Sequence, residues 1–443
     1  MEPMKDQQSN FQVMHNNAAG IDIASSMHYV AVPEDRDAHP VRKFGSFTQD
    51  LHEMARWLKS CRIDTVAMES TGVYWVQPFL VLEEYGFDVY LVNARHINNV
   101  PGRKSDVKDC QWIQQLHSCG LLKRSFQPED LIRELRTYTR HRKDLTQGYA
   151  SQVQLMQKAF EMMNIKLHNV LSDITGKSGS LIIRAILEGE RDANVLAELA
   201  DKGVKATKEE IVKSLQGIWR QDNLFELKQA FELYQYYQEK IHNCDRQIES
   251  VLQHLVSTSG RELKKTRHRK ASGKNSFNFD ASSYLNTITG VDLTDIYGIS
   301  EITVAGIISE TGTDMSKWPT VKHFTSWLNL SPNTRISGGK KLKGKKSRKK
   351  NHAGQAFLMA ASTLKASNNW LGEFYRRIKS KSGAPIAIKA TARKLAVIVY
   401  QMLIDKVPFK PLDVQQYNKN FKERKIKYLN KVALNYGLKL VAV

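Results

Sequence analysis

The sequence has few cysteines and no long hydrophobic run. Its four cysteines, among 443 residues, form no CxxC pair and no cysteine–histidine spacing of a zinc site. Scattered cysteines exclude a disulfide scaffold and favour a reducing, cytoplasmic compartment. No apolar stretch of about 18 residues occurs, which argues against a membrane span. The start, MEPMKDQQSN, lacks the apolar core of a signal peptide, so we expect a cytoplasmic protein with no membrane partner.

Acidic residues are scarce relative to basic ones. The chain has 66 lysines and arginines against 45 acids, a formal net charge of +21. Segment 261–274 has seven basic residues and one acid, and segment 335–350 has nine basic residues and no acid. Because both lie inside the chain, this surplus predicts a polyanionic partner such as nucleic acid. The alternative is a pair of solvated, disordered segments.

The first part of the chain has patterns typical of an α/β domain. Apolar residues favour strands in 19–32 and 41–47, which predicts an antiparallel meander. The expected elements are two strands in 19–32 about a turn at Ser25-Ser26, a strand at 41–47, a helix at 48–61 with Thr48 as N-cap, a strand at 64–70, a helix at 72–86, a strand at 88–94 and a helix from Ser105. A meander followed by alternating helices and strands is the layout of an α/β RNase H/RuvC-like fold.

After residue 128 the strand patterns give way to helical ones. Apolar residues recur at helical spacing from Leu131 to Leu167 and from Leu224 to Leu255, which predicts a helical arm. These two helices pair within one chain or between subunits, and we favour dimerisation. The expected segments are an RuvC-like domain at 17–127, a helical coiled-coil arm at 128–256, a basic linker at 257–283, a mostly α-helical domain at 284–410 and a basic tail at 411–443.

The C-terminal domain contains a pattern that resembles a helix-hairpin-helix. It spans 289–312 and has Gly298 at its turn. Such a turn offers backbone N–H groups that can bind a phosphate. We therefore expect this element to contact a nucleic-acid backbone.

Four acidic residues lie on two predicted strands and one predicted helix. Asp22 interrupts an apolar strand, Glu69 ends a neighbouring strand, and Asp106 and Asp109 share one helix face. Clustered acids repel each other unless a cation neutralises them, and hard carboxylate oxygens suit Mg²⁺ or Mn²⁺. We predict that these four residues hold such a metal and are catalytic. Singly each could be structural, as Asp106 would be beside a helix N-terminus.

Basic residues flank the acids. Arg95, His96, Arg103 and Lys104 lie between Glu69 and the acidic helix. We predict that they bind nucleic-acid phosphates, with ordinary surface charge as the alternative.

Ser337, followed by two glycines, stands at the head of the second basic segment. Nearby cations would stabilise negative charge on a phosphorane while the serine attacks. The alternative is that these three residues form an ordinary Ser-Gly-Gly turn. The hydroxyls of Ser331 and Thr334 are rival candidates for the nucleophile. The candidate nucleic-acid ligands here are Arg335, Gly338, Gly339, Lys340, Lys341, Lys343, Lys345 and Lys346.

Four stretches carry a resemblance to a known family. GIDIASSMHYVAV, MESTGVYW, NARHINNVPGRKSDVKDCQWIQQLHSCGLL and SWLNLSPNTRISGGK resemble the DEDD transposases of bacterial insertion sequences. The likeness is to the IS110 family, in its IS-eleven-eleven branch, over about residues 17–410. It implies a RuvC-like domain whose acidic tetrad is Asp22, Glu69, Asp106 and Asp109, and a nucleophilic serine at Ser337. The loop at 261–274 departs from shorter members in length and sequence.

The resemblance also implies partners and a reaction. Family members are recombinases that move their element as a circular intermediate, with a structured noncoding RNA that pairs with donor and target DNA. They assemble as a tetramer of two dimers, in which the RuvC-like domain of one subunit joins the serine domain of another. We therefore expect a nucleoid-associated bacterial transposase that uses Mg²⁺ or Mn²⁺, a guide RNA, donor and target DNA and a covalent serine–DNA link.

Two other functions fit the residues. A RuvC-like endonuclease that hydrolyses DNA junctions would need the acidic tetrad but not Ser337. A non-catalytic DNA- or RNA-binding protein would use the basic segments, bind with a steep salt dependence and tolerate substitution of the acids.

Overall fold

The computed structural model describes residues 13–93, 106–265, 273–332, 335–342, 351–439 and 441. At residues 106, 335, 336, 341 and 342 it describes the backbone without the side chain. The chain divides into two compact units, Met1–Gln127 and Pro128–Val443. Among the described helices, each is too short or too polar to cross a membrane.

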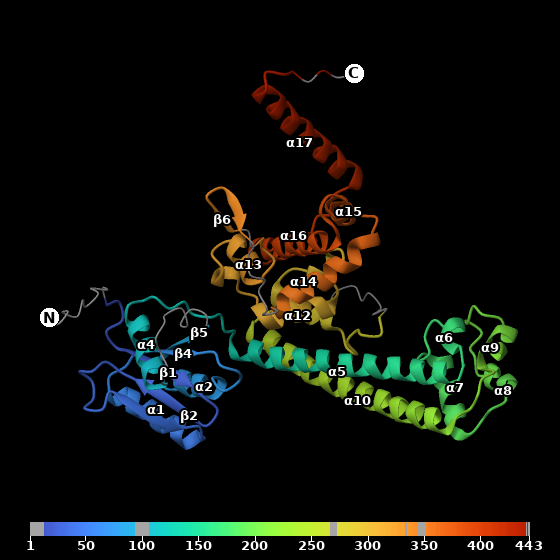
Figure 1. The fold of residues 1–443 in the computed structure, drawn as a ribbon, viewed down its shortest axis with the longest axis horizontal. Coiled ribbons are helices and arrows are strands. Elements are labelled where there is room, and N and C mark those ends of the chain that lie inside the picture. Colours follow the sequence, from blue (N-terminus) through green and yellow to red (C-terminus); the bar gives the residue numbers. More distant parts are fainter. Residues whose placement is uncertain are drawn as a thin grey trace, which may run out of the picture. The chain divides into compact units, whose positions relative to one another are not determined.

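The first unit contains a mixed five-stranded sheet (Figure 1). Its strands are β1 (Ala18–Ile23), β2 (Met27–Ala31), β3 (Val41–Gly45), β4 (Thr65–Glu69) and β5 (Asp88–Val92). The order is β3-β2-β1-β4-β5, in which β1, β2 and β3 pair antiparallel while β4 is parallel to both β1 and β5. The predicted meander and the alternating elements after it are confirmed. The sheet is consistent with an RNase H-like domain.

The two faces of the sheet differ because side chains alternate along each strand. Ile21 of β1 and Met68 of β4 belong to a large core with α1 (Thr48–Ser60) and α2 (Val76–Glu84). Ala67 faces the other side, where it packs with Ile113 of α4 (Asp106–Ser118). The residues that share the face of Ala67, by alternation, are Ala18, Gly20, Asp22, Thr65 and Glu69. This second face is covered by α4.

Two boundary predictions in this unit are wrong. The N-cap of α1 is Phe47 and not Thr48, and the backbone N–H of Phe47 donates to the Asp50 carboxylate at 3.1 Å. The helix predicted from residue 72 begins at Val76, because a turn with Gly72 at φ +53° precedes it.

The second unit begins with two long antiparallel helices, α5 (Asp130–Met162) and α10 (Gln221–Thr258) (Figure 1). Four short helices lie between them in sequence and cap one end of the pair. They are α6 (Leu167–Val170), α7 (Lys177–Glu188), α8 (Ala193–Glu198) and α9 (Lys208–Leu215). Phe160 and Phe231 are buried in the core that these helices share. The two apolar seams therefore meet within one chain, and pairing between subunits stays a prediction.

A buried ion pair crosses this helical pair. Arg142 of α5 contacts Asp245 of α10 at 2.5 Å, and both side chains are almost fully buried. Two residues from the end of the predicted basic linker join them. The Arg142 guanidinium lies 4.7 Å from the centre of the Phe277 ring, and Asn278 donates to Asp245 at 2.9 Å. Lys274 pairs with Asp173. The described end of the linker thus folds against the protein.

Further helices and one hairpin form the rest of the unit. They are α11 (Ala281–Thr289), η1 (Leu293–Asp295), α12 (Glu301–Thr311), η2 (Met315–Lys317), α13 (Val321–Trp327), β6 (Arg335–Ser337), β7 (Lys340–Leu342), α14 (His352–Thr363), η3 (Leu364–Ala366), α15 (Trp370–Ser382), α16 (Ala384–Asp405) and α17 (Val414–Asn435). Gly298, at φ +79°, precedes α12, whose N-cap is Ser300. The helix-hairpin-helix and its phosphate contact stay predictions.

Candidate functional site

Asp22 and Glu69 lie at corresponding positions of neighbouring parallel strands. Ile21 of β1 pairs with Met68 of β4 at the end of the register, so the next residue on each strand is one of the two acids. Adjacent strands lie about 4.8 Å apart. Both side chains are half-buried, and by alternation both face α4. The strands therefore bring the two carboxylates to the same edge of the sheet.

Helix α4 approaches β1 closely because residue 20 has no side chain. A Cβ on Gly20 would lie 2.5 Å from the Cys110 carbonyl oxygen and would also overlap the Gln114 backbone. The Gln114 side chain donates to the Ala18 carbonyl at 3.3 Å. Ala18 begins β1 and Gln114 lies one turn after Cys110, so α4 runs antiparallel to β1. The N-terminal end of α4 therefore lies toward Asp22.

The pKa of the Cys110 thiol depends on its burial and on the carboxylates around it. Its thiol is fully buried and donates to the Val107 carbonyl at 3.1 Å. Burial first, and then the carboxylates of Asp22 and Asp109, raises the pKa of Cys110 to about 12. Asp109 is the neighbour of Cys110 in α4, and Asp22 lies two residues beyond Gly20, on which α4 packs at Cys110. Three elements, β1, β4 and α4, therefore bring Asp22, Glu69 and Asp109 to one side of the sheet.

The fourth acid, Asp106, is the first residue of α4, one turn before Cys110, and only its backbone is described. Glu69 accepts a hydrogen bond from the Thr71 hydroxyl at 3.0 Å. Among the side chains that the structure describes, no three His, Cys, Asp or Glu residues gather closely enough to hold one metal ion. The donor set nevertheless consists of carboxylate oxygens, which are the ligands that Mg²⁺ and Mn²⁺ prefer. The residues therefore fit such an ion by chemistry.

Ser337 lies in the second unit at the start of a two-residue hairpin turn. Ser337 pairs with Lys340 across β6 and β7, and Gly338 and Gly339 form the turn with φ of +55° and +74°. Two consecutive positive φ angles are those of a type I′ turn, which favours glycine. A Cβ on either glycine would meet no atom within 4 Å. The turn thus accounts for both glycines, and it leaves Ser337 exposed.

Most of the predicted phosphate ligands fall outside the described side chains. Arg95, His96, Arg103, Lys104, Lys343, Lys345 and Lys346 lie outside the described residues, and the side chains of Arg335 and Lys341 are not described. Lys340 is exposed on the hairpin. Of the rival hydroxyls, Ser331 lies 3.2 Å from the Thr325 hydroxyl, and Thr334 is outside the described residues.

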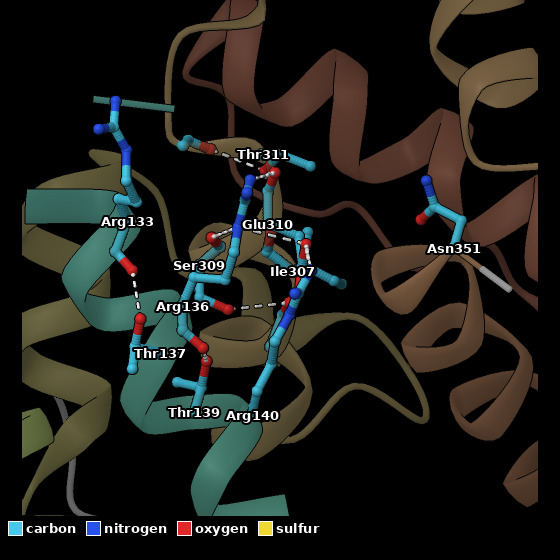
Figure 2. Close-up of polar contacts among 12 residues, drawn as sticks. Arg133, Arg136, Thr137, Thr139, Arg140, Ile307, Ser309, Glu310, Thr311 and Asn351 are labelled. Atoms are coloured by element: carbon cyan, nitrogen blue, oxygen red, sulfur yellow. Dashed lines mark hydrogen bonds and ion pairs between the residues drawn. The ribbon is translucent and has the colours of Figure 1, made fainter. Parts of the chain in front are cut away.

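A buried glutamate in the second unit was missed by the sequence reasoning. Figure 2 shows Glu310 of α12 facing two arginines of α5. Arg140 donates to both carboxylate oxygens of Glu310, at 2.7 and 2.9 Å, and Arg136 donates to the Ser309 and Glu310 carbonyls at 3.2 and 3.0 Å. Burial lowers the pKa of Arg136 to about 10. This junction fixes α5 against the helices that follow the linker.

The residue that follows the second basic segment is anchored by two hydrogen bonds. Asn351, labelled in Figure 2, is the N-cap of α14 and accepts from the Gly354 N–H at 2.8 Å. Its amide donates to the Trp327 carbonyl at 3.1 Å. Asn351, the first residue after this segment, is therefore bonded to α13.

The fold and the acidic edge define the class as an RNase H-like α/β domain joined to a helical unit. Two family models match the chain, a DEDD transposase model at residues 19–165 and a model for the IS116/IS110/IS902 transposases at residues 292–376. The matched stretches together cover just over half of the 443 residues. No curated protein matches the chain. The chain belongs to the IS110 family of DEDD transposases, which act on DNA.

Proposed function

We propose that this transposase cleaves and exchanges DNA strands with its acidic tetrad and Ser337. The observation that carries the proposal is the meeting of β1, β4 and α4. Asp22 and Glu69 follow paired residues of neighbouring strands, and Gly20 lets the helix of Asp106 and Asp109 lie against β1. Acidic side chains at one sheet edge, in a chain of net charge +21, suit a metal ion and a nucleic acid together.

Asp22, Glu69, Asp106 and Asp109 would hold Mg²⁺ or Mn²⁺. When bound, such an ion neutralises the charge that develops on a scissile phosphate. Without a cation, the four carboxylates would repel both one another and the DNA backbone. Gly20 supports the arrangement, because it lets α4 lie close enough to β1 for its acids to reach the edge.

Ser337 would act as the nucleophile. Its Oγ forms a bond to the phosphorus while the bond from phosphorus to the leaving sugar oxygen breaks, and the serine proton ends on that oxygen. The DNA end is then a phosphoserine ester, which conserves the bond energy. A hydroxyl of another strand reverses the step, so rejoining requires no ATP.

The remaining partners follow from charge and from the family. We propose that the basic segments bind donor and target DNA and a structured noncoding guide RNA, and that the α5–α10 arm supports a dimer or tetramer. One observation favours the rival endonuclease. The type I′ turn explains Gly338 and Gly339 without catalysis, so Ser337 could be a plain turn residue and hydrolysis would not need it.

The test mixes the protein, co-expressed with the noncoding DNA of its element, with donor and target duplexes and Mg²⁺, and then detects DNA on denatured protein. We expect a DNA adduct on a peptide that contains Ser337, and its loss in Ser337→Ala. Ser331→Ala is the matched hydroxyl control and should keep the adduct. Cleaved DNA without an adduct would favour the hydrolytic endonuclease.

The same reaction tests the carboxylates. Asp22→Asn and Glu69→Gln should abolish cleavage, since each removes one anionic ligand at little change in volume. Asp88→Asn is the matched control, because Asp88 lies in the same sheet at the opposite end of β5. Its ion pair with Arg124 is half-exposed and contributes little to stability. Equal cleavage by all three variants would sink the proposed site.

A further inference from the structure

The C-terminal helix α17 lies beyond both family-matched stretches, the second of which ends at residue 376. Its first turns are anchored on α15. The guanidinium of Arg377 lies 3.6 Å from the centre of the Phe421 ring and donates to the Tyr417 hydroxyl at 3.2 Å and to Asn418 at 2.9 Å. The ring of Trp370 is 5.6 Å from that of Tyr417. These contacts fix the direction in which α17 leaves α15 (Figure 1).

The rest of α17 carries aromatic and basic side chains without burying any of them. No residue of this helix, which the structure describes in full, is buried. Phe421, Lys425, Tyr428 and Val432 follow one another at steps of three or four, so they share one face, and Tyr436 is the C-cap that follows the helix. Tyr428 is 66% exposed and Tyr436 is 79% exposed. Large exposed aromatic side chains next to lysines are typical of a surface that binds a partner.

The net charge of α17 and the residues beside it indicates the charge of that partner. Residues 413–439 contain seven lysines and arginines against two acids, Asp413 and Glu423. The net charge of the segment is therefore +5, by subtraction of these counts. A polyanion is the complementary partner.

We propose that α17 binds an unpaired stretch of RNA, whose bases stack on Tyr428 and Tyr436 while Lys425 contacts phosphate. Exposed aromatics interleaved with lysines suit unpaired bases, because every base has a face that stacks on an aromatic ring. In duplex DNA the base faces are already stacked on one another. A duplex would therefore contact only the lysines, through its phosphates, and would leave the tyrosines unused. A side-chain amide such as that of Asn430, near the lysines, suits the 2′-hydroxyls of RNA.

A membrane surface and a second helix are the alternative occupants of this face. Ile426 and Leu429 lie on the same half of the helix as Tyr428, but Lys425 projects from the middle of that half. A membrane-surface helix or a coiled-coil seam would bury that position, which would remove the Lys425 charge from water without a partner. The proposal depends neither on the acidic tetrad nor on Ser337, so it and the proposed catalytic site fail separately.

The test uses the full chain and matched substitutions on two faces of the same helix. Tyr428→Ala is compared with Leu434→Ala, which removes an equally exposed side chain (71%) from another face. Lys425→Ala is compared with Lys427→Ala, which removes the same charge from the opposite face. Binding of a short fluorescent oligouridine is measured by anisotropy at fixed salt, with excess duplex DNA to occupy sites that recognise only the backbone. Thermal unfolding checks that each variant is folded.

We expect Tyr428→Ala to weaken oligouridine binding roughly five- to hundredfold, the range for loss of one stacked base, and Leu434→Ala to change it little. Lys425→Ala should weaken binding more than Lys427→Ala, and a photoreactive oligouridine should crosslink to peptides of α17. Equal effects of the two members of each pair would overturn the proposal. So would equal affinity for oligothymidine, binding to anionic vesicles that depends on Tyr428, or self-association that Tyr428→Ala abolishes.

Discussion

Adding one methyl group at residue 20 should separate α4 from β1. In Gly20→Ala the new Cβ would lie 2.5 Å from the Cys110 carbonyl oxygen and closer still to the Gln114 backbone. These are backbone atoms of a helix, so no rotamer change relieves the overlap. The helix must move away from the strand, and its acids move with it.

The magnitude follows from overpacking. Inserting one methylene-sized group into a well-packed contact costs about 1–3 kcal/mol. For a unit of this size, that corresponds to a loss of roughly 3–10 °C in melting temperature. Because Asp109 moves relative to Asp22, DNA cleavage should fall by more than the folded fraction does.

The assay pairs thermal unfolding with the DNA cleavage reaction. Gly306→Ala is the matched control, because Gly306 lies inside α12 with no atom near its missing Cβ. Alanine there should be neutral or stabilise by up to about 1 kcal/mol, since it is the better helix former. A Gly20→Ala protein with the stability and cleavage rate of the unsubstituted chain would refute the close approach of α4 and β1.

Three further predictions concern buried charges. Glu310→Ala should destabilise the second unit by about 3 kcal/mol, because it leaves the largely buried Arg136 without its acid. Urea unfolding measures this loss of stability, and a loss no larger than that of an exposed ion pair would contradict the prediction. Asp245→Ala should cost about 3–5 kcal/mol by stranding Arg142, whereas replacing both partners with apolar residues should cost much less. Burial lowers the pKa of His117 to about 4, so the unfolded chain binds this proton more readily. Stability should therefore fall as pH drops from about 6.5 to 4, and His117→Gln should flatten that dependence in pH-stepped melts.

Short apolar runs and apolar residues at steps of three and four were enough to predict the sheet and the long helices. The strands β1 and β4 stood out as short apolar runs because both of their faces are buried, and Asp22 and Glu69 stood out because acids are rare in such strands. The seams around Phe160 and Phe231 predicted α5 and α10 for the same reason. These patterns are visible in the sequence because burial requires an apolar residue at each buried position.

Contacts between distant residues left no local pattern. Gly20 reads as an ordinary glycine until α4 lies across it, and Cys110 reads as a scattered cysteine until two acids flank it. The Arg140–Glu310 contact joins residues 170 positions apart, which no spacing rule detects. The tail was predicted only as basic, and the helix α17 that it forms buries no residue.

Binding of Mn²⁺ tests the acidic edge most directly. Titration of the protein with Mn²⁺, followed by electron paramagnetic resonance, counts bound ions in the unsubstituted chain, Glu69→Gln and Asp88→Asn. If β1, β4 and α4 assemble one metal site, the unsubstituted chain and Asp88→Asn bind Mn²⁺ alike and Glu69→Gln loses most of that binding. Equal binding by all three proteins, or none in the unsubstituted chain, would contradict a metal site at this edge.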